Sequence, residues 1–121
     1  MPKLLFIEDD DQLIKLYKNI LEDEGFIVTT AQTGKDGLGQ LSKDRPDLII
    51  LDIMLPGGMN GFDVLEQLKK TDEYKTIPIF VLTNLDGEEK MAKKIGAVDC
   101  IVKAHVDPKD VVLKIKNTLQ L

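Results

Sequence analysis

The chain has one cysteine, no long apolar run and no basic excess, and each shortage excludes a class of protein. A single Cys100 excludes an internal disulfide and fits a reducing compartment. No apolar stretch approaches the roughly 20 residues of a membrane helix. The N-terminus, Met1-Pro2-Lys3, runs directly into an apolar segment and leaves no room for a signal peptide. We therefore expect no membrane span and a cytoplasmic location.

Charge and length restrict the function classes further. The net charge is −5 and no basic stripe is present, so direct nucleic-acid binding is not expected. A chain of 121 residues with 43% hydrophobic and 31% charged residues suits one compact domain with a real core. We expect that domain to cover residues 1–121.

Five short apolar segments alternate with five helical patterns. Strands are expected at about 3–7, 27–31, 47–51, 77–82 and 98–102. Unbroken apolar runs suit strands that are buried on both faces of a parallel sheet. Five such units predict an α/β fold, a doubly wound parallel sheet of five strands with flavodoxin-like order 2-1-3-4-5. That order would place Asp9 beside Asp52.

The helical segments carry recognisable start and stop signals. The segment after the acidic cluster places Leu13, Ile14, Tyr17, Ile20 and Leu21 on one face. The helix from about Gly34 to Ser42 carries Gly37 and Gly39 in its interior and is expected to be the shortest or least stable. Three later helices are expected to start at Asn60, Asp86 and Asp107.

Reactive residues follow the apolar runs at four strand ends. The run at 4–7 stops on Glu8-Asp9-Asp10-Asp11, and those at 48–51, 79–82 and 101–102 stop on Asp52, Thr83 and Lys103. In doubly wound sheets, sites form just beyond the carboxyl ends of the strands. Carboxylates, a hydroxyl and an ammonium group would thus meet at one edge. Together they would bind a divalent cation and a phosphoryl group.

Each of these residues has a chemical interpretation. Glu8 and Asp9 are candidate ligands of Mg²⁺, which prefers a few carboxylates plus waters, whereas Asp10 and Asp11 would cap the following helix. Asp52 is the candidate nucleophile for an acyl phosphate, or alternatively a third metal ligand. Lys103 would offer a positive charge to phosphoryl oxygens, and Thr83 a hydroxyl donor.

The chain resembles the receiver domains of two-component response regulators, of the stand-alone type, over essentially its whole length. Four segments carry the resemblance: Leu5-Phe6-Ile7-Glu8-Asp9-Asp10, Pro46 to Gly57 around Asp52, Ile77 to Thr83, and Gly96-Ala97-Val98-Asp99 leading to Lys103. The resemblance implies that Glu8 and Asp9 position Mg²⁺ (Mn²⁺ is also possible), with Asp52 and the backbone carbonyl of Met54 as further ligands. It also implies that Asp52 is the phosphoacceptor and that Thr83 and Lys103 contact the phosphoryl group.

The resemblance also carries expectations about partners. The phosphoryl donor would be a histidine kinase, a phosphotransfer protein or a small acyl phosphate. Phosphorylation would shift a surface on the fourth helix, fifth strand and fifth helix, where a downstream protein target would bind. The domain would catalyse only its own phosphorylation and slow dephosphorylation, without turnover of an external substrate, as a monomer or weak homodimer.

Several positions depart from the family pattern. Cys100 stands where an aromatic switch residue is usual, and Ala104 follows Lys103 where a cis proline is usual. We therefore expect a trans or strained cis bond after Lys103, and we interpret His105 as a solvated loop residue. The loop from Gly57 to Gly61 is one residue longer than usual, and its glycines permit positive φ and close backbone approach.

Met54 and Leu85, two positions beyond Asp52 and Thr83, resemble positions that in this family influence how water reaches the acyl phosphate. Both are apolar here and cannot orient an attacking water, and Asn84 is larger than the small residue that the family often has beside the threonine. The resemblance therefore implies a slowly hydrolysing phosphorylated form.

Three alternatives share the architecture. A haloacid dehalogenase-type phosphatase would need Asp-x-Asp followed by a glycine and threonine turn, which the acidic cluster lacks. A flavodoxin-like cofactor binder would need a phosphate loop where this chain has four acids. A degenerate receiver, acting as a phosphorylation-independent interaction module, remains open because of Cys100 and Ala104.

Overall fold

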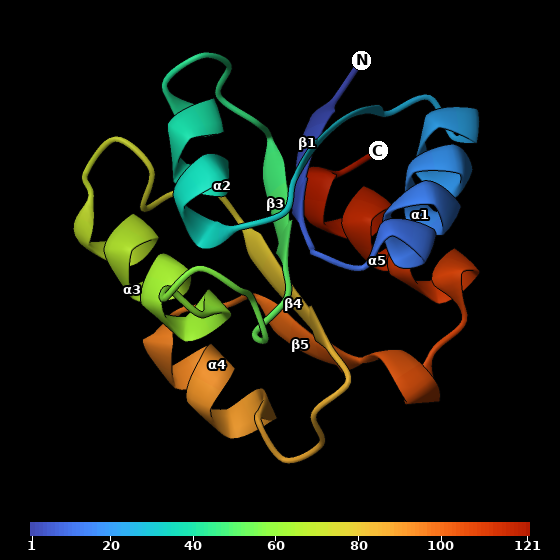
Figure 1. The fold of residues 1–121 in the computed structure, drawn as a ribbon. Coiled ribbons are helices and arrows are strands. Elements are labelled where there is room, and N and C mark those ends of the chain that lie inside the picture. The colour runs from blue at the N-terminus through green and yellow to red at the C-terminus, as the bar shows by residue number, and fades with distance from the viewer.

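Five parallel strands form the centre of the molecule, in the order β2-β1-β3-β4-β5 (Figure 1). The computed structural model describes residues 1–121. The strands are β1 (Lys3–Ile7), β2 (Ile27–Ala31), β3 (Leu48–Leu51), β4 (Ile79–Thr83) and β5 (Asp99–Val102). The predicted fold class and strand order are confirmed, and Thr83 proves to be the last residue of its strand.

Helices cover both faces of the sheet. They are α1 (Asp11–Asp23), α2 (Gly34–Leu41), α3 (Gly61–Lys70), α4 (Glu89–Ile95) and α5 (Pro108–Leu119), with a short 3₁₀ turn at Lys103–His105. Figure 1 shows α1 and α5 on one face and α2, α3 and α4 on the other. None of these helices combines the length and apolar character that spanning a membrane requires.

Two hydrophobic clusters fill the layers between helices and sheet. The cluster under α1 and α5 includes Phe6, whose ring meets that of Tyr17 edge to face with centroids 5.8 Å apart. The cluster under α2, α3 and α4 includes Leu65 and Cys100. Every residue of β3 and β4 is buried, as expected for strands covered on both faces.

Most helix starts follow the predicted signals. Asp10 caps α1 by accepting hydrogen bonds from two backbone N–H groups. Asn60 and Asp107 cap α3 and α5, each in a reciprocal capping box with the residue three positions later. Polar side chains therefore fix where these three helices begin.

The predicted start of the fourth helix is wrong, and the glycine-containing helix is not the shortest; its relative stability stays a prediction. The fourth helix does not start at Asp86 but at Glu89, because the carboxylate of Asp86 accepts a hydrogen bond from the adjacent N–H of Gly87 and Glu88 makes no side-chain cap. As a result α4 has 7 residues and is the shortest helix, whereas the glycine-containing α2 has 8. The glycine at 37 lets α2 pack closely on Ile7, and this tertiary contact offsets a low helix propensity.

Candidate functional site

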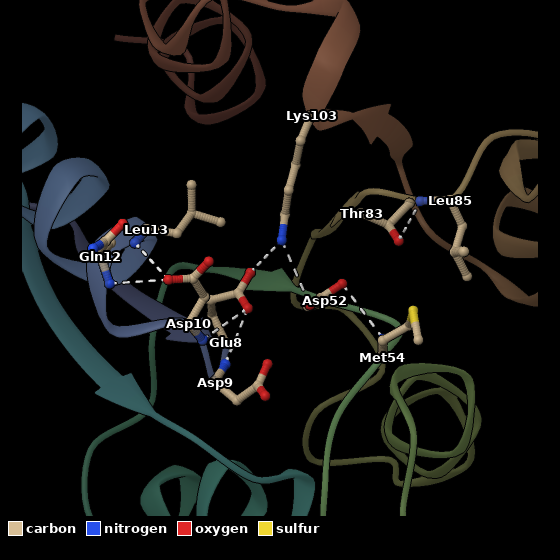
Figure 2. A network of polar contacts seen from close by, with 10 residues as sticks. All are labelled: Glu8, Asp9, Asp10, Gln12, Leu13, Asp52, Met54, Thr83, Leu85 and Lys103. Atoms are coloured by element: carbon tan, nitrogen blue, oxygen red, sulfur yellow. Dashed lines mark hydrogen bonds and ion pairs between the residues drawn. The ribbon is translucent and has the colours of Figure 1, made fainter.

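The carboxyl ends of β1, β3, β4 and β5 meet at one edge of the sheet and bring the predicted side chains together (Figure 2). β1 and β3 pair in parallel with Ile7 beside Leu51, so the residues that follow, Glu8 and Asp52, lie side by side. Carboxylate oxygens of Glu8, Asp9 and Asp52 lie within 4.8 Å of one another. The predicted adjacency of the two acidic strand ends is therefore confirmed.

Lys103 connects the end of β5 to both buried carboxylates. Its Nζ donates to Glu8 Oε1 at 2.6 Å and lies 3.6 Å from Asp52 Oδ2. The Lys103 side chain is 12% exposed and that of Glu8 is 1% exposed. Because the pair is largely removed from water, loss of either partner would leave a buried charge uncompensated.

Glu8 has both oxygens occupied. Oε1 accepts from Lys103, while Oε2 accepts from the backbone N–H groups of Asp9 at 3.0 Å and Asp10 at 3.2 Å. Burial raises the pKa of Glu8 to about 7, with a further increase from the charge of Asp52, against the opposing effect of the Lys103 hydrogen bond. The turn after β1 thus holds Glu8 in one position.

The donor set suits a hard dication. Two of the three clustered carboxylates are buried and the third, Asp9, is exposed. Like charges at this spacing repel one another, and a bound cation relieves that repulsion. Oxygen ligands in this number match Mg²⁺ or Mn²⁺, which complete their shells with water.

Asp52 is held by the backbone around it. Its N–H donates to the carbonyl of Ile7 at 3.0 Å, and its Oδ1 accepts from the N–H of Met54 at 3.4 Å. The Asp52 carboxylate therefore lies between the Lys103 ammonium group and the backbone N–H of Met54, as Figure 2 shows.

Gly61 is a positioning residue for Asp52, a role that the sequence argument did not single out among the glycines of this loop. Its N–H donates to the carbonyl of Ile53 at 2.7 Å, and a Cβ at this position would lie 2.1 Å from the backbone oxygen of Asp52. Only glycine permits this approach. The predicted positive φ of the preceding glycines is confirmed at Gly57 and Gly58, with values of +88° and +83°. Asn60 as a helix cap was the available sequence signal for a close turn here.

Thr83 lies at the same edge but contacts its own loop. The residue is fully buried, and its hydroxyl oxygen accepts from the N–H of Leu85 at 3.2 Å. No hydrogen bond joins it to the carboxylates. The structure therefore brings Glu8, Asp9, Asp52 and Lys103 into one group and leaves Thr83 beside it.

The β5 side shows the expected departures. No peptide bond in the chain is cis, so the expectation of a trans bond after Lys103 is confirmed, and residues 103–105 form a 3₁₀ turn. Cys100 is buried, and burial, with the nearby charges of Glu89 and Asp99, raises its pKa to about 11. The thiol is thus protonated at neutral pH and packs as a small apolar side chain. His105 is exposed, as expected.

Comparison with known proteins agrees with this geometry. The family model described as "Response regulator receiver domain" matches residues 4–116. Transcriptional regulatory protein AfsQ1 of Streptomyces coelicolor is 44% identical over 105 residues, which are 85% of this chain and 45% of that protein. The chain also spans about half of the CpxR homolog of Haemophilus influenzae, with 34% identity over 122 residues, 99% of this chain and 51% of the relative.

Solved structures show the same fold over the whole chain. The BeF3-activated N-terminal receiver domain of Klebsiella pneumoniae RstA matches with a TM-score of 0.89 and 28% identity, covering 98% of this chain and 99% of that one. Chemotaxis protein CheY4 of Vibrio cholerae matches with a TM-score of 0.86 and 30% identity, covering 97% and 98%.

Proposed function

Because the chain belongs to the response regulator receiver domain family, we propose that it is a phosphoacceptor signalling domain in which Asp52 receives the phosphoryl group. The observation that carries the proposal is the buried Asp52 carboxylate, which lies beside Lys103 and within one cluster of acids at the sheet edge. The donor is a histidine kinase, a phosphotransfer protein or a small acyl phosphate.

The transfer is a displacement at phosphorus. An oxygen of Asp52 attacks, a P–O bond forms, and the bond from phosphorus to the donor nitrogen or oxygen breaks, with its electron pair leaving on the donor. The Lys103 ammonium stabilises the negative charge on the transferring oxygens, at a position fixed by its ion pair with Glu8. The Thr83 hydroxyl turns from the Leu85 amide to donate to a phosphoryl oxygen.

Glu8, Asp9, Asp52 and the backbone carbonyl of Met54 would hold Mg²⁺, or Mn²⁺ in its place. The clustered carboxylates support this assignment. When bound, the cation would supply positive charge that offsets the negative charge of the phosphoryl group. Glu8 has a second task, because the same carboxylate holds Lys103.

The signalling role also implies how the domain acts. We propose that residues 1–121 form one receiver domain, which acts in the cytoplasm as a monomer or weak homodimer. It does not turn over an external substrate. The downstream partner is a protein that binds α4, β5 and α5. Exposed apolar side chains at Met91 in α4 and at Val98, which precedes β5, support that location. Direct nucleic-acid contact is not expected of the acidic domain itself, although AfsQ1 is a transcriptional regulator.

Acetyl phosphate tests the assignment. We expect the intact mass of the protein to rise by one phosphoryl group with acetyl phosphate and Mg²⁺, and to stay unchanged without the cation. Asp52→Asn should not be labelled. Asp47→Asn is the matched control, because Asp47 precedes the same strand at its opposite end and accepts only from the Lys3 N–H. Equal labelling of Asp52→Asn and wild type would contradict the proposal.

A second candidate function follows from Cys100 and from the trans bond after Lys103. Cys100 replaces the usual aromatic switch residue and Ala104 replaces the usual cis proline, as could occur in a degenerate receiver that acts as a phosphorylation-independent interaction module. In that case the wild type would bind Mg²⁺, measured separately by calorimetry, but would gain no phosphoryl group.

A further inference from the structure

We propose that a groove between α1 and α5 is a self-association surface, at which two copies of this chain meet about a twofold axis. The groove has a volume of about 420 Å³ and is lined by Ile20, Asp23, Glu24, Lys109, Val112 and Leu113. We call it the α1–α5 groove. Figure 1 shows α1 and α5 on the face of the sheet opposite to α4, and self-association there requires no phosphorylation of Asp52.

The centre of the α1–α5 groove is apolar and open to solvent. Leu113 of α5 is 59% exposed and lies beside the buried Val112. Ile20 lines the groove from α1, and Leu16, one helical turn earlier on the same side of that helix, is 47% exposed. Single exposed leucines are ordinary on a protein surface, but apolar side chains that two helices bring together around one groove indicate an interaction site.

The two ends of the groove carry opposite charges that have no partner within the chain. Asp23, in the last turn of α1, and Lys109, in the first turn of α5, are both exposed, and neither takes part in an ion pair. The adjacent Glu24 is held by Lys116 at 2.6 Å, which places the acidic end beside the later turns of α5. Lys109 lies about two turns earlier, or roughly 10 Å along the helix axis.

A groove with one acidic end and one basic end is complementary to a second copy of itself. A twofold axis through the groove reverses the direction of the helices, so Asp23 of one protomer faces the partner's Lys109, and the same contact occurs twice. The exposed leucines then meet at the centre, where burial of apolar surface favours association. The charges at the rim determine the direction of pairing. A second copy therefore matches both the apolar and the charged features of the groove.

Self-association through the α1–α5 groove would leave the acidic site and α4 open. The site lies at the carboxyl ends of the strands, and α4 packs on the opposite face of the sheet (Figure 1). A dimer would therefore present two sites and two α4 surfaces at once. An interface built around one such groove is at the small end of specific interfaces, so we expect weak association.

Sedimentation velocity of the unphosphorylated protein without Mg²⁺ tests the surface, at concentrations up to about 1 mM so that weak association is detected. We expect the wild type to shift from monomer to dimer as the concentration rises. Leu113→Asp should raise the dissociation constant by about tenfold or more, because a charge would be buried at the centre of the interface. Met91→Asp places the same charge at a residue that is 49% exposed on α4, and it should leave the dissociation constant unchanged.

Two charge reversals test the direction of pairing. Lys109→Glu and Asp23→Lys should each weaken self-association, because each variant brings like charges together twice. An acid in the first turn of α5 and a base in the last turn of α1 both suit the helix dipole, so neither change should unfold its helix. An equimolar mixture of the two variants should recover the dimer, because each mixed dimer joins the two altered side chains to each other and keeps one native pair of Asp23 and Lys109.

Each outcome decides part of the proposal. A wild type that stays monomeric at the highest concentration would overturn it and leave the groove to another protein. A dimer that Met91→Asp disrupts and Leu113→Asp does not would place the interface on α4 instead. A mixture no more dimeric than the separate charge variants would overturn the antiparallel pairing. Urea unfolding of each variant shows whether the fold is kept, and since no phosphoryl donor is present, failure here leaves the proposed function untouched.

Discussion

The two halves of the sheet edge differ in how firmly their side chains are held. In the acidic half, at the ends of β1 and β3, both oxygens of Glu8 are bonded and Asp52 is flanked by Lys103 and the Met54 amide. In the responsive half, after β4, the Thr83 hydroxyl bonds only its own loop, and α4 begins without a side-chain cap.

This difference separates binding from response. A site that takes a cation and a phosphoryl group benefits from ligands fixed before binding, because little ordering is then needed. A segment that signals needs two arrangements of similar free energy. The acidic half has the first property, and the segment from Asn84 to Glu88, with one hydrogen bond to Thr83 and no side-chain cap, is the candidate for the second. The following predictions test the two halves separately.

Removal of Lys103 should affect the acidic half most. Lys103→Met leaves Glu8 and Asp52 without a positive partner, and we expect a loss of about 3 kcal/mol in unfolding free energy at pH 8 without Mg²⁺. Urea unfolding measures it. Saturating Mg²⁺ should recover part of the loss, and a variant as stable as wild type without the cation would show that the acids do not strain the site.

Gly61→Ala should distort the support of Asp52. The added Cβ would lie 2.1 Å from the Asp52 carbonyl oxygen, so the backbone must shift, at a cost of about 1–3 kcal/mol. Gly39→Ala is the matched control: it faces open space within α2 and should stabilise the helix by about 1 kcal/mol. Thermal unfolding compares them, and equal effects in both variants would remove Gly61 from the support of the site.

The lifetime of the phosphorylated form should depend on the side chains of Met54 and Leu85. Met54 is exposed and Leu85 is half-buried, and neither side chain can orient an attacking water. We expect the label on Asp52 to persist after donor removal and Met54→Asn to lose it several-fold faster. Decay of intact mass with time gives both rates. Rapid decay in the wild type would contradict this assignment.

The smallest predicted effect lies outside the site, at the ion pairs that join β5 to its flanking helices. Partial burial alone would raise the pKa of Asp99, but hydrogen bonds from Lys114 and the Cys100 amide, with the charge of Lys93, hold it below its ordinary value. A carboxyl with a lowered folded-state pKa contributes stability above its unfolded pKa, near 4, and loses it as the pH falls through the folded value.

Comparison of wild type and Asp99→Asn should therefore show a difference of about 0.2–1 kcal/mol at pH 7. The difference should shrink as the pH falls below about 4. A difference that stays constant from pH 7 to pH 3 would assign it to packing instead of charge.

Much of the fold and part of the site could be predicted because the signals are local. Apolar runs mark the buried strands, and their last residues mark the edge where Glu8, Asp52, Thr83 and Lys103 lie. Parallel pairing of β1 and β3 then follows from fold class. The helices at Asn60 and Asp107 begin as predicted because their capping residues are adjacent in sequence to the groups that they bond.

What could not be predicted depends on contacts between distant residues. The stronger partner of Lys103 is Glu8, at 2.6 Å, although Asp52 was the expected focus of the site. The glycine-rich loop before α3 indicates a close backbone approach, but that Gly61 meets the carbonyl of Asp52 depends on tertiary contact. The start of α4 was predicted at Asp86 because the capping signal is present, and the structure shows that the signal is not used.

The most direct test is amide exchange across the whole chain, with and without Mg²⁺ and beryllofluoride, the activator named for the RstA receiver. The same exchange experiment is run in parallel on the Asp52→Asn variant. We predict that protection in the wild type changes most at Lys90 and Met91 and little in β1 and β3, and that Asp52→Asn shows no change at α4. Changes confined to β1 and β3, or equal changes in both proteins, would contradict a fixed acidic half coupled to a responsive α4.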